Sequence, residues 1–179
     1  MLTNSADGFN VTTIGTFGIS TGAIVAGDPC YAPEDGGVVK IFAKNGTWQA
    51  VAVLDRDGTV REIAAQNSSH ASSFGFQTKA GEISVDSGQA GFFDAEIFPK
   101  CHEELYDEIC NATNEGNGGT IEGGVASSSG YGDGTYDLFA SLDENGLAVA
   151  LRIVFVSDEE EEPEDEPEDD DDDEMREDD

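Results

Sequence analysis

The sequence predicts an α+β fold made mainly of antiparallel β-sheet, with one helix packed on the sheet and a disordered acidic tail. Glycine is abundant, with 22 residues in 179, and most glycines separate short runs of β-branched and aromatic residues, as turns separate antiparallel strands. Only one segment has the periodicity of a helix. Residues 157–179 are almost entirely acidic and lack the apolar side chains that a core needs. We therefore expect a single β-rich domain over residues 8–156 and a disordered polyacidic tail over residues 157–179.

In the first part of the chain, the strands are expected to form hairpins in sequence. Asn45-Gly46 separates two β-like runs and favours a type I′ turn, because both residues accept a positive φ. The turn Asp55–Gly58 then leads into a third strand, which completes a three-stranded meander. The pairings expected here are Thr16–Ser20 with Ala23–Ala26, and Val38–Ala43 with Thr47–Leu54 and then Thr59–Ala65.

The second half of the domain contains the one expected helix, over residues 100–112. Cys101, Leu105, Ile109 and Ala112 recur at helical spacing and form its apolar face, and Pro99 suits its first turn. The glycine-rich residues 111–124 are expected to form a loop. The remaining strands are expected at Glu82–Asp86, Gln89–Phe93, Val125–Ser128, Thr135–Leu142 and Leu147–Val156.

Two patterns predict burial. The last strand is apolar on both faces apart from Arg152, which is typical of a strand in the middle of a sheet. Trp48 lies in an alternating strand, so we expect its side chain in the core.

The charge distribution excludes some classes of partner. The chain has 39 acidic and 8 basic residues, and residues 157–179 hold 18 of the acids and one of the bases. A domain so poor in lysine and arginine is not expected to bind nucleic acid or an anionic membrane. No apolar run is long enough for a transmembrane span, and the first residues do not resemble a secretory signal. The acidic tail is expected to aid solubility or to contact basic proteins or cations.

The three cysteines, Cys30, Cys101 and Cys110, argue for a reducing compartment. Their odd number and irregular spacing do not fit a disulfide framework, so a cytoplasmic location is expected. Their spacing does not match a structural zinc site, and Cys101 falls on the apolar face of the helix, which favours simple burial. The sequence indicates no cofactor and no metal.

Two segments are candidates for a ligand site, Val85–Asp94 and Ser127–Tyr136. Each follows an expected strand and combines glycines with hydroxyls, a carboxylate and aromatic rings, so that the backbone could approach a ligand closely. The alternative is that these residues only satisfy the turns in which they stand. If the loops meet, Asp28, Asp86, Asp94 and Asp133 could form one carboxylate cluster. The candidate ligand-binding residues are Asp86, Ser87, Gln89, Asp94, Ser129, Tyr131, Asp133 and Tyr136.

Four motifs in this order resemble a family of bacterial and bacteriophage proteins whose function is not established. The motifs are Gly27-Asp28-Pro29-Cys30-Tyr31, Asp86-Ser87-Gly88-Gln89-Ala90-Gly91, Ser128-Ser129-Gly130-Tyr131-Gly132-Asp133-Gly134-Thr135-Tyr136 and the closing strand Ala148–Phe155. The resemblance spans about residues 18–156 and leaves out the tail. It implies a shared fold and a phage or prophage source, and it implies no catalytic residue.

The favoured function is a non-catalytic binding protein that holds a small polar ligand or a protein between its two Gly/Ser/Asp loops. One alternative is a structural or interaction module whose tail acts by charge. Another is an Asp-dependent hydrolase that uses the carboxylate cluster with His70 or His102.

Overall fold

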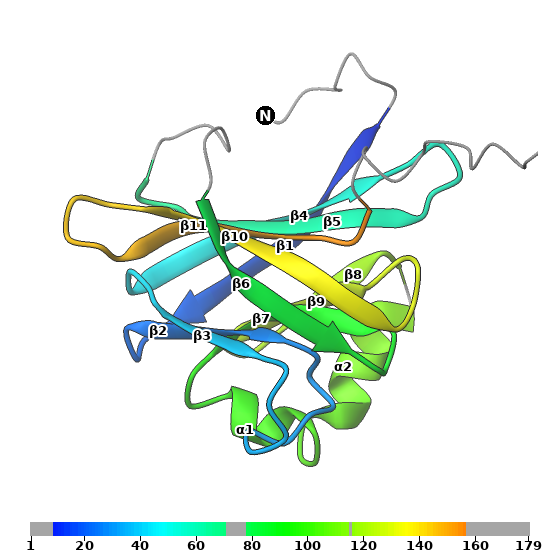
Figure 1. Cartoon of the computed structure of the whole chain (residues 1–179), viewed down its shortest axis with the longest axis horizontal. Coiled ribbons are helices and arrows are strands. Elements are labelled where there is room, and N and C mark those ends of the chain that lie inside the picture. Colours follow the sequence, from blue (N-terminus) through cyan, green and yellow to red (C-terminus); the bar gives the residue numbers. More distant parts are fainter. Residues whose placement is uncertain (1–8, 71–77, 115, 157–179) are drawn as a thin grey trace, which may run out of the picture.

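The computed structural model describes residues 9–70, 78–114 and 116–156, which form two antiparallel sheets packed face to face (Figure 1). The predicted class, mainly antiparallel β with little helix, is confirmed. The six-stranded sheet has the order β1 (Asn10–Ile19), β4 (Gly46–Leu54), β5 (Val60–Asn67), β11 (Ala148–Val154), β10 (Gly134–Leu142) and β6 (Thr78–Val85). The five-stranded sheet has the order β3 (Val39–Phe42), β2 (Ala23–Gly27), β7 (Gln89–Asp94), β9 (Gly124–Ser128) and β8 (Gly118–Ile121). The tail, residues 157–179, lies outside the described residues.

The main core fills the space between the two sheets. Alternate residues of β4, among them Trp48, point toward the other sheet, where Phe92 of β7 belongs to the same apolar cluster. Trp48 is fully buried, as predicted, and its indole N–H donates a 2.9 Å hydrogen bond to the carbonyl of Lys44. Burial of apolar surface, at about 25 cal/mol per Å², is the main force that holds the sheets together.

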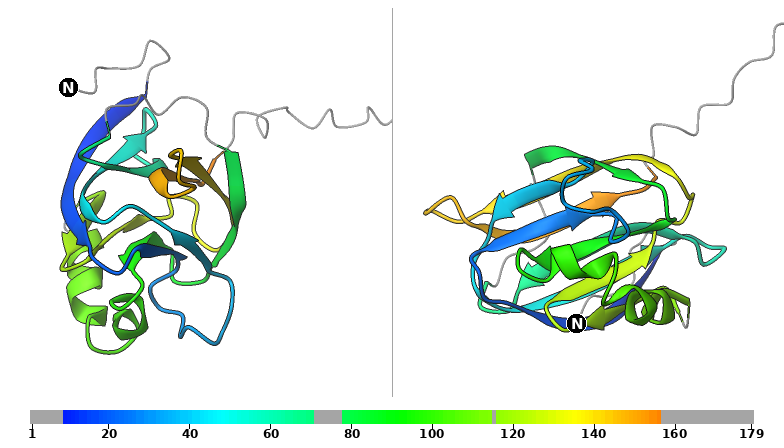
Figure 2. Two further views of the ribbon diagram at one scale, coloured as in Figure 1. Left: turned by 90° about the vertical axis from the view of Figure 1, so that its left-hand side faces the viewer. Right: turned by 90° about the horizontal axis from the view of Figure 1, so that it is seen from below.

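Two short helices cover the outer face of the five-stranded sheet, where one longer helix was predicted (Figure 2). They are α1 (Phe98–Cys101) and α2 (Tyr106–Asn114), and residues 102–105 break the helix between them. The break lets both Phe98 of α1 and Ile109 of α2 reach a second apolar cluster under the sheet. Tertiary packing therefore overrides the helical pattern. Cys101 is fully buried in this cluster, as predicted.

Some predicted hairpins are wrong, because the chain crosses between sheets at those turns. Residues 43–45 connect β3 in one sheet to β4, which begins at Gly46, in the other, and residues 20–22 likewise connect β1 to β2. The two connections bond to each other: the Asn45 Oδ1 atom accepts the Gly22 N–H at 2.6 Å. The φ of Gly46 is +125°, so its positive φ is confirmed although the hairpin is not.

Other local predictions are confirmed. The β4–β5 and β10–β11 pairs are hairpins, and β11 lies inside the six-stranded sheet between β5 and β10.

The glycine-rich residues 111–124, predicted to be a loop, contain the end of α2, all of β8 and the start of β9. Close packing explains why this strand is rich in glycine. A Cβ atom on Gly119 would lie 2.7 Å from the Cβ of Ala112 in α2, and one on Gly118 would lie 2.6 Å from the carbonyl oxygen of Ala126 in β9. Glycine therefore lets β8 fit between the helix and its neighbouring strand.

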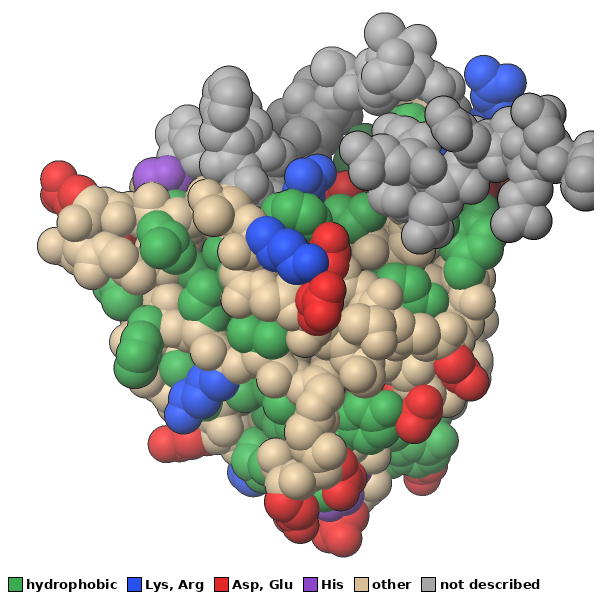
Figure 3. Space-filling model, viewed as in Figure 1, with side chains coloured by type: hydrophobic (Ala, Val, Ile, Leu, Met, Phe, Trp, Pro, Cys, Tyr) green, Lys and Arg blue, Asp and Glu red, His purple; other side chains and the backbone are tan. Residues whose placement is uncertain are grey.

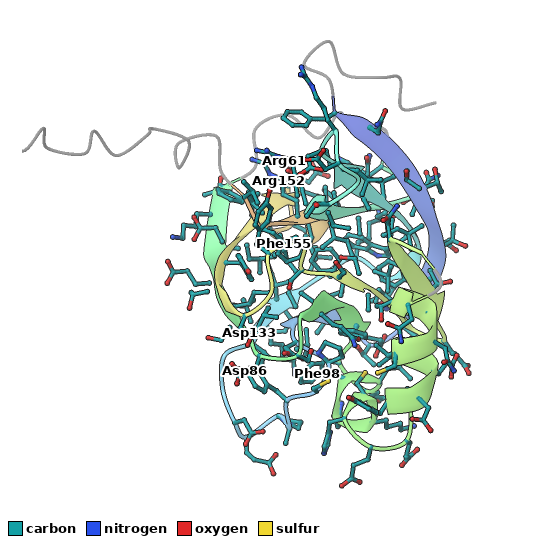
Figure 4. The ribbon with its side chains drawn as sticks, turned by 90° about the vertical axis from the view of Figure 1, so that its right-hand side faces the viewer. Arg61, Asp86, Phe98, Asp133, Arg152 and Phe155 are labelled. Carbon is teal, nitrogen blue, oxygen red and sulfur yellow. The ribbon has the colours of Figure 1, made fainter. Side chains whose placement is uncertain are left out.

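The outer face of the six-stranded sheet carries a partly buried ion pair. The Arg152 guanidinium lies 3.4 Å from the Glu62 carboxylate and stacks 4.8 Å from the ring centroid of Phe139. Burial raises the pKa of Glu62, and the charges of Arg152 and Arg61 oppose that rise. Figure 4 shows both arginines gathered at this end of the molecule, away from the five-stranded sheet.

Candidate functional site

The two turns singled out from the sequence lie side by side. Residues 86–88 connect β6 to β7, and residues 129–133 connect β9 to β10. Gln89 pairs with Ser128 in one sheet, and Val85 pairs with Gly134 in the other. Both connections therefore cross between the sheets at the same end, and the Ser129 N–H donates a 2.8 Å hydrogen bond to the Gly88 carbonyl.

The first turn is held by a buried carboxylate, that of Asp28. Its Oδ2 atom accepts the backbone N–H groups of Asp86 at 2.9 Å and Ser87 at 2.8 Å. Its Oδ1 atom accepts the Ser87 hydroxyl at 2.7 Å and the Cys30 N–H at 2.8 Å. Four donors compensate the burial of this charge. Ser87, a predicted ligand residue, is therefore used to build the turn.

Three more of the predicted ligand residues are also engaged within the protein. The hydroxyls of Ser129 and Tyr136 both donate to the Gly132 carbonyl, at 2.7 and 2.8 Å, and close the second turn. The Gln89 Nε2 atom lies 3.6 Å from the Cys110 sulfur. The alternative that the residues satisfy their own turns accounts for Ser129 and Tyr136, whereas Gln89 contacts α2 instead.

The side chains that remain exposed at this end are Asp86, Asp133 and Tyr131. Figure 4 shows the two aspartates near each other, and Tyr31 lies within hydrogen-bonding reach of Asp86. Burial, a hydrogen bond to Asp86 and the negative charges of Asp86, Asp28 and Asp133 raise the pKa of Tyr31 to about 12. Tyr131 is 60% exposed, and its hydroxyl lies 3.4 Å from the Asp55 carboxylate. Within the described ranges, no three His, Cys, Asp or Glu side chains are placed to share a metal ion.

Asp94 lies at the other end of β7, so the predicted cluster of four aspartates is wrong. Gln89–Asp94 is strand β7, as expected for Gln89–Phe93, and it separates Asp94 from the two turns by about 16 Å of extended chain. Asp94 is buried, and its carboxylate accepts the N–H groups of Ser20 at 2.8 Å, Glu96 at 2.9 Å and Thr21 at 3.1 Å. Burial acts to raise the pKa of Asp94, but these N–H donors outweigh it and hold the pKa below its ordinary value of 3.8.

Asp94 stands at one side of a surface groove of about 550 Å³, which we call the seam groove. The groove runs along the second half of β1 and is bounded on its far side by the β8–β9 connection and by the residues after β7. Its lining residues are Thr16, Phe17, Gly18, Ile19, Ser20, Gly46, Asp94, Glu96, Ile97, Ile121, Glu122 and Gly123.

The seam groove exists because β1, at the edge of the six-stranded sheet, diverges from β8 of the five-stranded sheet partway along its length. Figure 2 shows β1 curving down the side of the sandwich beside β8. A Cβ atom on Gly15 would lie 3.0 Å from the Thr120 side chain, so the two sheets touch there. Beyond Gly15 they separate. The opposite seam is closed, because the Ser84 N–H donates a 2.8 Å hydrogen bond to the Gly37 carbonyl.

The seam groove has an apolar floor and an acidic rim. Phe17 and Ile19 of β1 and Ile121 of β8 are buried, whereas Glu96 and Glu122 are exposed. None of the residues that line the groove is basic. On the face in Figure 3, the described Lys and Arg side chains also stand singly among uncharged and acidic ones.

Sequence reasoning missed Tyr31, Glu96 and Glu122. Tyr31 ends the Gly27–Tyr31 motif, which is the only signal that could have found it. The two glutamates carry no local signal, because their position on a rim follows from how β1 and β8 diverge.

No helix in the described part of the chain has the length and apolar character required to cross a bilayer. No protein-family model, curated protein or solved structure matches this chain. The resemblance to bacterial and phage proteins therefore stays a prediction, and function is argued from the geometry of the two turns and of the seam groove.

Proposed function

We propose that this domain is a non-catalytic binding protein that holds its ligand in the seam groove. The observation that carries this proposal is the groove itself, a preformed hollow with an apolar floor, an acidic rim and a strand edge along one wall. Its titratable side chains are Asp94, Glu96 and Glu122. Because Asp94 already accepts three backbone N–H groups, the arrangement supports binding better than proton transfer.

The test is a chemical-shift survey of the full ¹⁵N-labelled chain. Short peptides of either charge, free amino acids, sugars and nucleotides are added one at a time, and amide shifts are mapped onto the fold. We expect saturable shifts that cluster at Thr16–Ser20 and Ile121–Gly123. Hits that are converted to product during the experiment would contradict a purely binding role, and a survey with no shifts at the groove would overturn the proposal.

The surface formed by Asp86, Asp133, Tyr31 and Tyr131, here called the turn surface, is a second candidate for the binding site. The observation in its favour is that both turns predicted from the sequence lie together there and leave two carboxylates exposed. The variant Asp133→Asn separates the candidates. It should leave binding unchanged if the ligand sits in the seam groove, and should abolish binding in a folded protein if the ligand sits on the turn surface.

The proposed setting is the cytoplasm of a bacterium or of a phage-infected cell. The odd number of cysteines supports a reducing compartment, and the resemblance of the motifs supports a phage or prophage source. Contacts of the acidic tail with basic proteins or cations are part of the same proposal. Alkylation of the chain after unfolding without a reductant, followed by mass analysis, should find three free thiols, because Cys101 is buried in the native fold.

A further inference from the structure

The geometry points to one class of ligand for the seam groove, an extended basic polypeptide segment that pairs with β1 as an added strand. This inference rests on the proposal that the groove is the binding site, and it names the partner. Three features of the groove favour such a ligand: the direction of the backbone groups of β1, the length of its free edge, and the charge of the rim.

The backbone of Gly18 points into the groove. Gly18 is opposite Thr47 in the β1–β4 ladder, but the Thr47 carbonyl accepts the Ser68 N–H at 2.8 Å, on the β5 side. In an antiparallel ladder a residue directs its N–H and C=O to the same side, so Gly18 and Thr47 form a pair that exchanges no hydrogen bond. The N–H and C=O groups of Gly18 therefore point away from β4.

The neighbouring residues agree with this orientation. Ser20, two positions further along, donates its N–H away from β4 to Asp94, at 2.8 Å. Thr16 is two positions before Gly18, so its N–H and C=O groups also point away from β4. Among the described residues β1 pairs only with β4, so it is the edge strand of its sheet. Such an edge is a template for an incoming strand.

The free edge has the length of a short peptide. Thr16–Ile19, which stops short of the Ser20 N–H that Asp94 already accepts, spans about 10 Å as extended chain and corresponds to a partner segment of three or four residues. Thr16 and Gly18 are exposed, so solvent reaches this part of the strand.

The acidic rim of the groove favours a positively charged ligand. An added strand would place alternate side chains near the apolar floor and near Glu96 and Glu122, which favours aliphatic residues alternating with lysine or arginine. The chain's own tail, with 18 acids and one base in residues 157–179, would be repelled. A second copy of the domain would bring the same acidic rim. The occupant is therefore a foreign basic segment.

The experiment uses the full chain and a capped, fluorophore-labelled pentapeptide that alternates lysine and valine. Affinity is measured by fluorescence anisotropy at physiological salt, and contacts are mapped by amide shifts. We expect shifts at Thr16–Ser20 and Ile121–Gly123. The double variant Glu96→Gln with Glu122→Gln should bind about tenfold more weakly, since each exposed charge contributes up to about 1 kcal/mol.

Two sets of control variants distinguish binding in the groove from the general attraction of a basic peptide to an acidic chain. The double variant Glu34→Gln with Glu104→Gln loses the same charge at exposed sites that do not line the groove, and it should bind within about twofold of the parent. Gly18→Pro deletes the N–H that faces the groove without removing a bond to β4, so it should abolish the groove shifts. Gly18→Ala keeps that N–H and should bind like the parent.

Equal losses in the two double variants would show that the peptide only senses net charge, and would overturn the inference. Binding that survives Gly18→Pro, or equal binding of a glutamate–valine peptide, would overturn it as well. If Gly18→Pro does not fold, the same question is answered by N-methylating the peptide, which removes the partner's N–H groups and should abolish binding. A groove that takes other ligands but not this peptide refutes the inference alone, whereas a groove that takes nothing refutes the proposed function too.

Discussion

At the scale of single residues, two buried carboxylates organise opposite ends of the sandwich. Asp28 accepts backbone hydrogen bonds from the turn between β6 and β7. Asp94 accepts them from the residues between β1 and β2 and from those after β7. Each accepts several backbone N–H groups, which is the arrangement that makes burial of a carboxylate tolerable. From the sequence both were candidates for one carboxylate cluster, but their contacts make them part of the framework.

Replacing Asp94 by asparagine should cost stability, and the cost should depend on pH. The amide cannot accept as strongly as the carboxylate, so Asp94→Asn should unfold more easily by about 1–3 kcal/mol at pH 7. The pKa of Asp94 is lowered in the folded state, so its stabilising effect is present above its ordinary pKa of 3.8 and is lost as pH falls below that value.

Urea unfolding at pH 7 and near pH 3 checks this prediction. The difference between the parent and Asp94→Asn should narrow at the lower pH. Asp57→Asn, which changes an exposed aspartate in the β4–β5 turn, should follow the parent at both. A difference that stays constant with pH would show that the lost stability comes from packing and not from charge.

Tyr31 offers a probe of the turn surface. Its pKa should be about 12, against an ordinary value of 10.0. Asp86→Asn should lower this pKa partway, because burial, the largest cause of the shift, remains. Folding favours the neutral phenol, so the contribution of Tyr31 to stability is complete below pH 10 and is lost as pH rises through 12.

The measurement is a pH titration followed by NMR of the Cζ carbon in a ¹³C-tyrosine-labelled chain. The Asp86→Asn chain, labelled in the same way, is the comparison. If Tyr31 titrates at the same pH in both chains, the Asp86 carboxylate does not act on Tyr31 as the geometry indicates.

At the scale of elements, the connection between β9 and β10 packs against the start of β5. Gly130 has a φ of +67°, and a Cβ atom there would lie 2.0 Å from the Val60 carbonyl oxygen. Gly132 has a φ of +92°, and a Cβ atom there would meet nothing within 4 Å. The same motif thus contains one glycine required by backbone conformation alone and another required also by close packing.

Gly130→Ala should therefore destabilise the domain by more than about 2 kcal/mol, because the backbone of β5 must move. Gly132→Ala should cost only about 1 kcal/mol, since it introduces backbone strain without a clash. Thermal and urea unfolding of both variants measure the difference. Equal losses would indicate that the 129–133 connection does not rest on Val60.

At the scale of the whole molecule, the charge is divided unevenly between the domain and the tail. Residues 157–179 carry 18 of the 39 acidic residues and have no aliphatic side chain beyond Met175. The core between the sheets is made by residues of the β-rich domain. We therefore expect folding to be independent of the tail.

Truncation after Ser157 tests this expectation. At moderate salt the melting temperature should change by no more than a few degrees, and unfolding should remain cooperative. A loss of cooperative unfolding would mean that the tail takes part in the fold. At low salt the truncated chain should be slightly more stable than the full one, because removing like charges reduces repulsion.

The sequence by itself determined most of the local structure. Positions of strands such as β10 and β11, the tight turns of two hairpins, the burial of Trp48 and the central place of β11 all follow from alternation and turn chemistry. The positions of the 86–88 and 129–133 turns at strand ends also followed from their motifs, although the sequence left open whether the two turns meet. These features depend on residues close together in the chain, or on whether a strand is apolar on one face or both.

Only the tertiary structure decided the rest. Whether Asn45-Gly46 closes a hairpin or crosses between sheets depends on Gly22, which is far away in the sequence. Whether Ser87 meets a ligand or Asp28 is equally non-local. The seam groove is the clearest case. The residues of β1 predict a strand, but its free edge arises because β8 turns away from it beyond Gly15. An open edge is a relation between distant segments, and no local pattern encodes it.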